Sequence, residues 1–480
     1  MIRSYRTEKP RVPKRRTYAL SRFKGINTQV AEEVLPLNYS PKSYNFCFGK
    51  GVLDPGYGAE KGYITTSEGR WEIKRRGIDV KFLKFFHYTM HHLTQRLEKL
   101  VGYGNDGRLY DMTVNELYSG FAPIGDYGEV MDAVPYVYQG DDGLLISTAT
   151  GLYFLRETTM TLLSSEEIFT SMCVHSDRVF AVLKQDQFKL CFSDDFDPKN
   201  WNVSLKEGGY FSFDTEMGKI VKTLSYGGYV YLFFEHGIMR LTAYNMQTEF
   251  HLQKLYLSPG GIYKNTIVPC GDKIIFASSD GVFLFDGLGI KKTMEGVEDL
   301  LDKEQSAAFA VHHGGKYYLA CRMNMDSSIS GENNSLIVYD TWDHTLDVAH
   351  DVSVLSMVSL DIDEVRGVLA NLNYPSDFIG LITKCGAVDG APTLKVWRSP
   401  VVTPGEDGDK KLLREVCVRC CGSGALKLVL DGTSCEYPLT DGLNKVRVMR
   451  VFDKIVVGFD FTSAAARVTS ATLTVDCYGE

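Results

Sequence analysis

The chain lacks the segments that mark membrane and exported proteins. No stretch approaches the ~18 consecutive apolar residues of a membrane-spanning helix. The basic residues near the N-terminus are not followed by the apolar core of a secretory signal. We therefore expect synthesis and folding in a cytoplasm. Global disorder is also excluded, because 44% of the residues are hydrophobic and charges of both signs are mixed.

The chain also lacks the short motifs that would identify an enzyme. It has no phosphate-binding P-loop, no Gly-x-Ser-x-Gly elbow, no dinucleotide fingerprint and no His-Glu-x-x-His helix. Carboxylate pairs such as Asp361 and Asp363 lie in turn-like surroundings, without a twelve-residue calcium loop. We therefore expect a protein that is not an enzyme and that binds no cofactor.

Cysteine is sparse and shows no disulfide or metal pattern. The eleven cysteines are an odd number and are scattered, mostly among Val, Leu and Phe, as reduced core thiols are. Cys417, Cys420 and Cys421 resemble half of a zinc site, but they fall in an expected strand, where neighbours face opposite sides. The pairs His91-His92 and His312-His313 meet the same objection. We expect no metal site.

The most regular feature is a repeated pair of strand-like segments. One half is a polar turn followed by an apolar strand, as at 227–233 and 314–320. The other half is a turn followed by an alternating strand, with starts at 107, 151, 187, 237, 281, 334 and 377. The spacing is near the ~40–50 residues of a propeller blade. This predicts an all-β chain with a β-propeller over residues 21–399. The expected blade number is about seven, with six or eight as alternatives, and the rival architecture is a long β-sandwich array.

The repeat stops after Trp397. Residues 400–411 are rich in Pro, Gly, Asp and Lys, which is typical of a linker or loop. Strand-like segments with period-two alternation then predict a small β-sandwich over residues 400–480; they are 413–421, 426–430, 445–452, 455–461 and 471–477. Within the propeller region, the apolar spacing of 297–309 predicts a short helix between blades.

Positive charge is concentrated at the N-terminus. Residues 1–20 hold seven basic groups and one acid, whereas the other residues carry a net charge of −14, which brings the chain to −8. Pro10 and Pro13 favour an extended arm over a helix. The arm has three interpretations: a solvated tail, docking on an acidic neighbouring subunit, or contact with nucleic-acid phosphates. The candidate contact residues are Arg3, Arg6, Lys9, Arg11, Lys14, Arg15 and Arg16.

Several short motifs resemble the structural propellers of phages. Residues 21–28 contain a Phe-x-Gly-Ile-Asn opening, and residues 51–58 form a glycine-rich turn. Residues 193–201 loosely resemble the Asp-box turn of sialidase propellers, although the turn occurs once and lacks its glycine. The exit strand 396–400 also fits the pattern. Together these motifs are similar to the tail hub or nozzle proteins of short-tailed phages, also called packaged-DNA stabilisation proteins.

The resemblance implies a structural protein of a phage virion, placed in the tail or the head–tail connector. It implies a ring of this chain, as a hexamer, that forms part of the genome conduit and helps to retain DNA. The implied partners are further copies of the chain, neighbouring portal, adaptor and tail proteins, and transiently genomic DNA. Two alternatives stay open: a tail-tip propeller that binds or depolymerises carbohydrate, and a propeller scaffold that binds other proteins.

Overall fold

The chain forms two compact units. The computed structural model describes residues 12–478, except 62, 67–68, 73–79, 93–94, 113–121, 203–207, 215, 245–246, 259, 330–332, 363–364, 375–377 and 407–409. The smaller unit comprises Met1–Gly58, Thr345–Ala349 and Thr383–Glu480, and the larger comprises Ala59–His344 and His350–Ile382. The chain passes between the units four times: within β5 (Gly58–Lys61), before and within β31 (Leu346–His350), and at the end of β34 (Phe378–Thr383).

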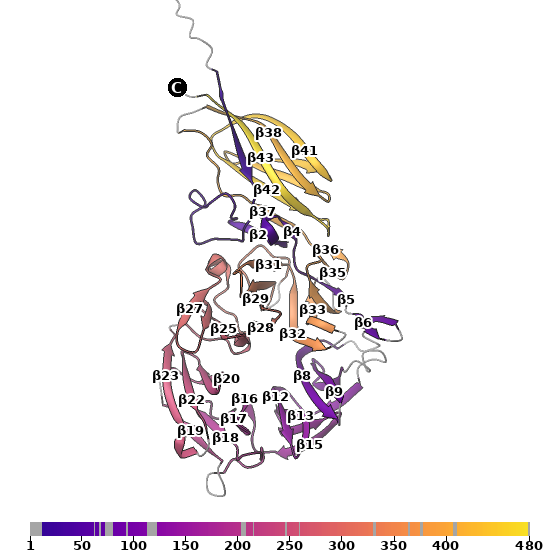
Figure 1. Ribbon diagram of the computed structural model, residues 1–480, viewed down its shortest axis with the longest axis vertical. Coiled ribbons are helices and arrows are strands. Elements are labelled where there is room, and N and C mark those ends of the chain that lie inside the picture. Colours follow the sequence, from indigo (N-terminus) through magenta and orange to yellow (C-terminus); the bar gives the residue numbers. More distant parts are fainter. Residues whose placement is uncertain are drawn as a thin grey trace, which may run out of the picture. The chain divides into compact units, whose positions relative to one another are not determined.

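The larger unit is a β-propeller with seven blades among its described residues (Figure 1). Each blade is an antiparallel sheet whose strands follow one another along the chain. Blade 1 consists of β8 (Phe82–His92), β9 (Gln95–Gly104), β10 (Arg108–Asp111) and β11 (Ala122–Asp126). Blade 2 consists of β12 (Val130–Tyr138), β13 (Asp141–Thr148), β14 (Gly151–Arg156) and β15 (Thr159–Ser164). Blade 3 consists of β16 (Phe169–His175), β17 (Arg178–Leu183), β18 (Lys189–Phe192) and β19 (Gly209–Ser212).

The remaining blades continue this order. Blade 4 consists of β20 (Ile220–Tyr226), β21 (Tyr229–Phe234), β22 (Gly237–Thr242) and β23 (His251–Leu257). Blade 5 consists of β24 (Val268–Cys270), β25 (Lys273–Ser278), β26 (Gly281–Phe285) and β27 (Ile290–Thr293). Blade 6 contains β28 (Phe309–His313), β29 (Lys316–Cys321) and β30 (Ser335–Asp340), and blade 7 contains β32 (Ser353–Ile362), β33 (Val365–Tyr374) and β34 (Phe378–Thr383). A separate hairpin is made of β6 (Tyr63–Thr66) and β7 (Gly69–Glu72).

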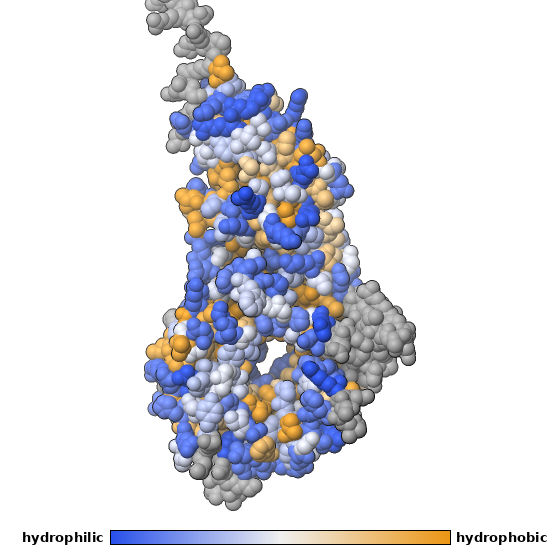
Figure 2. Space-filling view, viewed as in Figure 1, coloured by the Kyte–Doolittle hydropathy of each residue, from blue (hydrophilic) through white to orange (hydrophobic). Residues whose placement is uncertain are grey.

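The innermost strands of the blades surround a central channel. They are β8, β12, β16, β20, β24, β28 and β32. Figure 2 shows that the channel remains open when side chains are drawn in full. The ring closes where β32 of blade 7 meets β8 of blade 1. In addition, β5, from the N-terminal side of the propeller, lies next to β34 in the sheet of blade 7. A strand from one end of the propeller thus completes the blade formed by the other end.

Tight turns and aromatic packing explain why the repeat folds in this way. Gly227 and Gly228, between β20 and β21, have φ angles of 56° and 81°, which a two-residue hairpin turn requires and side-chain-bearing residues adopt at a cost. Between blades, the apolar faces of the sheets meet. Phe233 of blade 4 packs edge-on against Phe276 of blade 5, with ring centroids 5.7 Å apart, and both are fully buried.

The smaller unit is a β-sandwich. One sheet has the order β1 (Lys14–Leu20), β43 (Arg467–Tyr478), β38 (Lys410–Cys421) and β41 (Gly442–Phe452). The other has the order β2 (Lys42–Tyr44), β37 (Lys395–Arg398), β42 (Ile455–Phe461), β39 (Gly424–Leu430) and β40 (Thr433–Leu439). Two short pairs accompany them: β3 (Phe46–Cys47) with β4 (Asp54–Pro55), and β35 (Ala387–Val388) with β36 (Ala391–Pro392).

The core of the sandwich includes segments that the repeat pattern assigns to the propeller. Trp397 is fully buried, stacks on Phe459 at 5.5 Å and receives the edge of Phe23 at 5.0 Å. The sequence-based boundaries at 20/21 and 399/400 therefore differ from the bounds of the two units. The reason is burial: these aromatic residues complete the core of the sandwich, and no local pattern in the sequence indicates which core they join.

The helical expectation was wrong for most of its length. A short 3₁₀ helix, η4 (Glu295–Leu300), occupies only the first part of 297–309, and β28 already begins at Phe309. The residues between them form a loop. The other helices of the described residues are the 3₁₀ turns η1 (Gly49–Gly51), η2 (Gln247–Glu249) and η3 (Lys264–Thr266). Among the described residues, no helix is long and apolar enough to cross a membrane.

Candidate binding site

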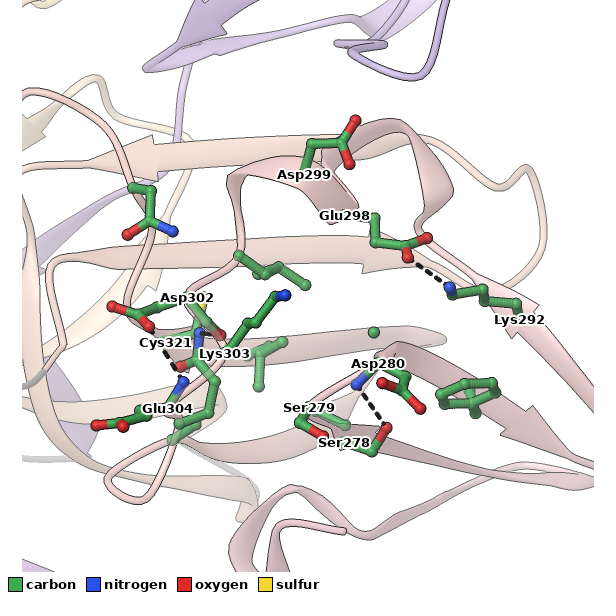
Figure 3. A pocket seen from close by; sticks show the side chains of 18 of the residues that line it. Ser278, Ser279, Asp280, Lys292, Glu298, Asp299, Asp302, Lys303, Glu304 and Cys321 are labelled. Atoms are coloured by element: carbon green, nitrogen blue, oxygen red, sulfur yellow. Dashed lines mark hydrogen bonds and ion pairs between the residues drawn. The ribbon is translucent and has the colours of Figure 1, made fainter. Parts of the chain in front are cut away.

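A cavity of about 900 Å³ lies between blades 5 and 6 of the propeller (Figure 3). One wall is the hairpin turn that joins β25 to β26, with Ser278, Ser279 and Asp280. The opposite side is formed by η4 and the loop 301–305, and β29 contributes Leu319 and Cys321. The volume is within the ~300–1,000 Å³ of ordinary ligand pockets.

The loop 301–305 is held in place by a buried glutamine. The Gln305 side chain is only 5% exposed. Its amide nitrogen donates to the main-chain oxygens of Asp302, at 2.9 Å, and Arg322, at 2.6 Å, while its oxygen accepts from the Arg322 main-chain nitrogen at 3.0 Å. Because all three bonds are to the main chain, they fix the path of the loop against the strand that precedes Arg322. The wall is thereby preformed.

Negative charge predominates around the cavity. Two of its carboxylates are neutralised: Glu298 pairs with Lys292 at 2.5 Å, and Asp302 with Arg322 at 3.3 Å. Three further carboxylates have no ion pair among the described residues: Asp280, Asp299 and Glu304. Among the described residues that line the cavity, Lys303 is the basic side chain left to balance them, and it extends into the cavity together with Asp280 (Figure 3). The site therefore attracts positively charged groups.

The thiol in the cavity wall is not an activated nucleophile. Cys321 is 1% exposed, and burial raises the pKa of its thiol well above the ordinary value, so the nucleophilic thiolate is disfavoured. Among the described residues, no group of three or more His, Cys, Asp or Glu side chains is arranged to hold a metal ion. What the cavity offers is fixed walls, hydrogen-bonding groups and unbalanced negative charge, which is an arrangement for binding.

The seven basic residues expected to form a contact arm do not share one environment. Arg3, Arg6, Lys9 and Arg11 lie outside the described residues. The other three belong to β1, which pairs with β43 of the sandwich. Arg15 lies 3.0 Å from the nearly buried carboxylate of Asp476, and Arg16 lies 3.9 Å from Glu406. Alternation places Arg16, which is half-buried, on the same face of the strand as the buried Leu20, and leaves Arg15 exposed on the opposite face.

Two of the motifs weighed for metal or sugar chemistry lie in the described residues as a packed turn and as part of a strand. In the turn 193–201, Trp201 donates to the Pro198 main-chain oxygen at 2.9 Å and packs on Phe169, with ring centroids 4.5 Å apart. Cys417 and Cys420 lie in β38, where only Cys420 belongs to the buried face. The acid-rich run from Glu298 to Glu304 was the one local signal for the cavity, and the sequence reading assigned it to a helix.

The sheet order defines the class: a seven-bladed β-propeller joined to a β-sandwich. No protein-family model matches the chain, and no curated protein sequence matches it. Solved structures similar to it include the WD40 domain of Pan2 from Neurospora crassa, with 10% identity, a TM-score of 0.36 and coverage of 62% of this chain and 93% of that one. Another is Hsv2 from Kluyveromyces lactis, with 8% identity, a TM-score of 0.34 and coverage of 64% and 94%.

These findings overturn the resemblance to phage tail hub or nozzle proteins. The similar structures named above are fungal propellers, and no family model supports membership of a phage family. A structural role in a phage tail or connector, and the tail-tip carbohydrate alternative, fall with the resemblance. The motifs misled because they consist of turn glycines and buried aromatics, such as Phe23, that β-rich folds use generally. The virion location and the portal, tail and DNA partners stay predictions of that resemblance alone.

Proposed function

We propose that this chain is a non-catalytic scaffold whose cavity between blades 5 and 6 binds a basic peptide segment. We further propose that the segment is the N-terminal arm of a second copy of the chain. The observation that carries the proposal is the set of three carboxylates without ion pairs, Asp280, Asp299 and Glu304, at a cavity with fixed walls. A Lys or Arg side chain entering there replaces some of its water contacts with charge-assisted hydrogen bonds.

The N-terminal arm has the complementary chemistry. Before β1 the chain carries four basic residues, Arg3, Arg6, Lys9 and Arg11, against the single acid Glu8. An extended chain spans at most ~3.3–3.6 Å per residue, so the segment preceding residue 12 can reach up to about 40 Å from the sandwich. That is enough to contact a neighbouring molecule. The propeller and the arm thus supply opposite charges within one sequence, as self-association requires.

The test is a charge swap read by the oligomeric state of the full chain. In the arm variant, Arg3, Arg6, Lys9 and Arg11 are changed to Glu; in the cavity variant, Asp280→Lys is combined with Glu304→Lys. We expect sedimentation at low salt to show concentration-dependent association of the wild type and a loss of at least tenfold in affinity for either variant. An equimolar mixture of the two variants should associate again, because the acidic arm of the arm variant then meets the basic cavity of the cavity variant.

A matched control is Glu166→Lys with Asp272→Lys, two exposed carboxylates of the propeller; Asp272 lies in the adjacent hairpin turn of blade 5. This control should associate as the wild type does, with the same salt dependence. Three results would overturn the proposal: a wild type that stays monomeric at every concentration, a mixture that fails to associate, or a control that is as defective as the cavity variant.

A further inference from the structure

The entrance to the central channel is built on a repeated irregularity of the inner strands. In five blades, a β-bulge interrupts the pairing of the inner strand near its start. The residue just after the bulge bonds the main chain of the following blade. The residues at this position, in blade order, are Lys84, Asp132, Ser171, Lys222 and Ser356.

Two of these five positions are occupied by lysine. The Lys84 ammonium donates to the Val130 main-chain oxygen at 2.6 Å, and the Lys222 ammonium donates to the Ile267 oxygen at 2.7 Å. A third lysine joins them: Lys264, from η3 before blade 5, donates to the Thr170 oxygen of blade 3. The Lys264 side chain therefore passes in front of blade 4, which carries Lys222. Serine at the equivalent positions shows that the blade-to-blade bond itself does not need a cation.

The positive charges of this cluster are not compensated by ion pairs. None of the three ammonium groups lies within 4.0 Å of a carboxylate oxygen in the described part of the chain. The carboxylate that acts on both Lys84 and Lys222 is that of the half-buried Asp132, and both its oxygens accept main-chain amides: one from Ala133 at 3.0 Å, the other from Met172 at 2.7 Å. Glu129, the other carboxylate that faces Lys84, is exposed. Each ammonium retains at least one N–H beyond its carbonyl contacts.

We propose that the channel entrance is a binding site for a small, multiply charged oxyanion, held by Lys84, Lys222 and Lys264. An oxyanion accepts hydrogen bonds from the remaining N–H groups of all three lysines. Its negative charge also compensates the repulsion between the lysines, whereas the neutral carbonyl groups do not. The site is separate from the acidic cavity of blades 5 and 6, and it attracts the opposite charge.

The electrostatics of the lysines agree with this geometry. The pKa of Lys222 is lowered to about 8, chiefly by desolvation and also by the positive charge of Lys264, against the opposing effect of Asp132. Desolvation and Lys264 also lower the pKa of Lys84. The protein thus holds these protonated lysines at a free-energy cost, which is typical of functional sites. A bound anion offsets the free-energy cost of keeping these lysines protonated.

The experiment is calorimetric titration of the full chain at low salt and pH 7, with pyrophosphate as the phosphate probe and citrate as the carboxylate probe. We expect saturable binding of at least one probe, weakened about tenfold by Lys222→Met or Lys84→Met. Tighter binding of pyrophosphate would identify a phosphate-type ligand, and tighter binding of citrate a carboxylate-type ligand. Absence of binding by both probes would overturn the proposal.

Two further variants separate the site from general effects. Lys291→Met removes an exposed lysine of blade 5 and should leave binding unchanged; an equal loss would mean that only net charge matters. Asp132→Asn removes the opposing carboxylate with little change of shape and should tighten binding several-fold. A folding defect cannot produce that gain, so weaker binding by a folded Asp132→Asn protein would contradict the proposed site.

Discussion

The hydroxyl of Ser356 donates a hydrogen bond of 2.6 Å to the main-chain oxygen of Phe82, 274 residues earlier in the sequence. Asn371 donates a second bond, at 3.2 Å, to the same oxygen. All of these groups are buried, and they join blade 7 to blade 1. The closure of the propeller therefore depends on a polar contact with a single carbonyl, as well as on apolar packing.

This closure predicts the effect of removing its donors. Ser356→Ala should lower the free energy of unfolding of the propeller by about 1–2 kcal/mol, because the buried Phe82 carbonyl loses a partner. Combining it with Asn371→Ala should cost more than the sum of single changes, since each donor partly replaces the other. Urea unfolding measures both. Ser306→Ala, at an exposed position, is the control, and a double variant as stable as this control would refute the prediction.

Lys222 predicts an unusual pH dependence. Its pKa is lowered to about 8 from an ordinary 10.5, so between these values the unfolded chain binds more protons at this group than the folded chain. Stability contributed by this position should therefore rise as the pH rises from about 8 toward 10.5. In Lys222→Met this rise should be absent. Thermal melts from pH 7 to 10 measure the difference, and parallel pH profiles for the two proteins would contradict it.

Asp476 predicts how the N-terminal strand is held. Its carboxylate is 1% exposed and lies 3.0 Å from Arg15 and 2.7 Å from Arg414, and the hydrogen bond from Arg15 leads the effects that lower its pKa. Asp476→Asn should loosen β1 and speed proteolysis near Arg15. In the wild type, the same loosening should appear only as the pH falls below about 4, because the lowered pKa of Asp476 keeps its carboxylate ionised at higher pH. Equal cleavage rates at pH 7 would count against this role.

Trp397 predicts a graded response in the sandwich core. The side chain is fully buried against Phe459 and Phe23, and its ring nitrogen is buried with no hydrogen-bond partner among the described residues. Trp397→Ala should cost about 3–5 kcal/mol of stability, because it leaves a large cavity. Trp397→Phe should cost much less, since it keeps an aromatic ring and removes the unsatisfied donor. Chemical unfolding of both variants distinguishes these outcomes; equal costs would show that ring packing is not the cause.

The blade repeat could be predicted from the sequence because it is a local pattern. Each of the seven expected turn starts, from 107 to 377, lies within two residues of the start of the third strand of a blade. In the sandwich, β40 escaped prediction: its segment Thr433–Leu439 carries Pro438 and mostly exposed side chains, so it lacks the apolar alternation that marks the other strands.

The candidate sites could not be predicted in the same way. The acidic run before Gln305 was visible, but nothing local shows that it faces a hairpin turn of blade 5. Lys84, Lys222 and Lys264 are separated by 138 and 42 residues along the chain, and the residues next to each lysine in the sequence form no motif that indicates a binding site. Their common position after a bulge, or just before an inner strand, exists only once the sheets are assembled.

Strand periodicity, turn glycines and the change of pattern after Trp397 were sufficient to determine the all-β class, the propeller and the following sandwich. These properties depend on residues a few positions apart, for which side-chain alternation and turn geometry are decisive. Tertiary structure alone decided which core received Phe23 and Trp397, where the ring closed, and which charges gathered at the cavity and the channel. Those outcomes depend on burial and electrostatics between distant segments, which act through space and leave no period in the sequence.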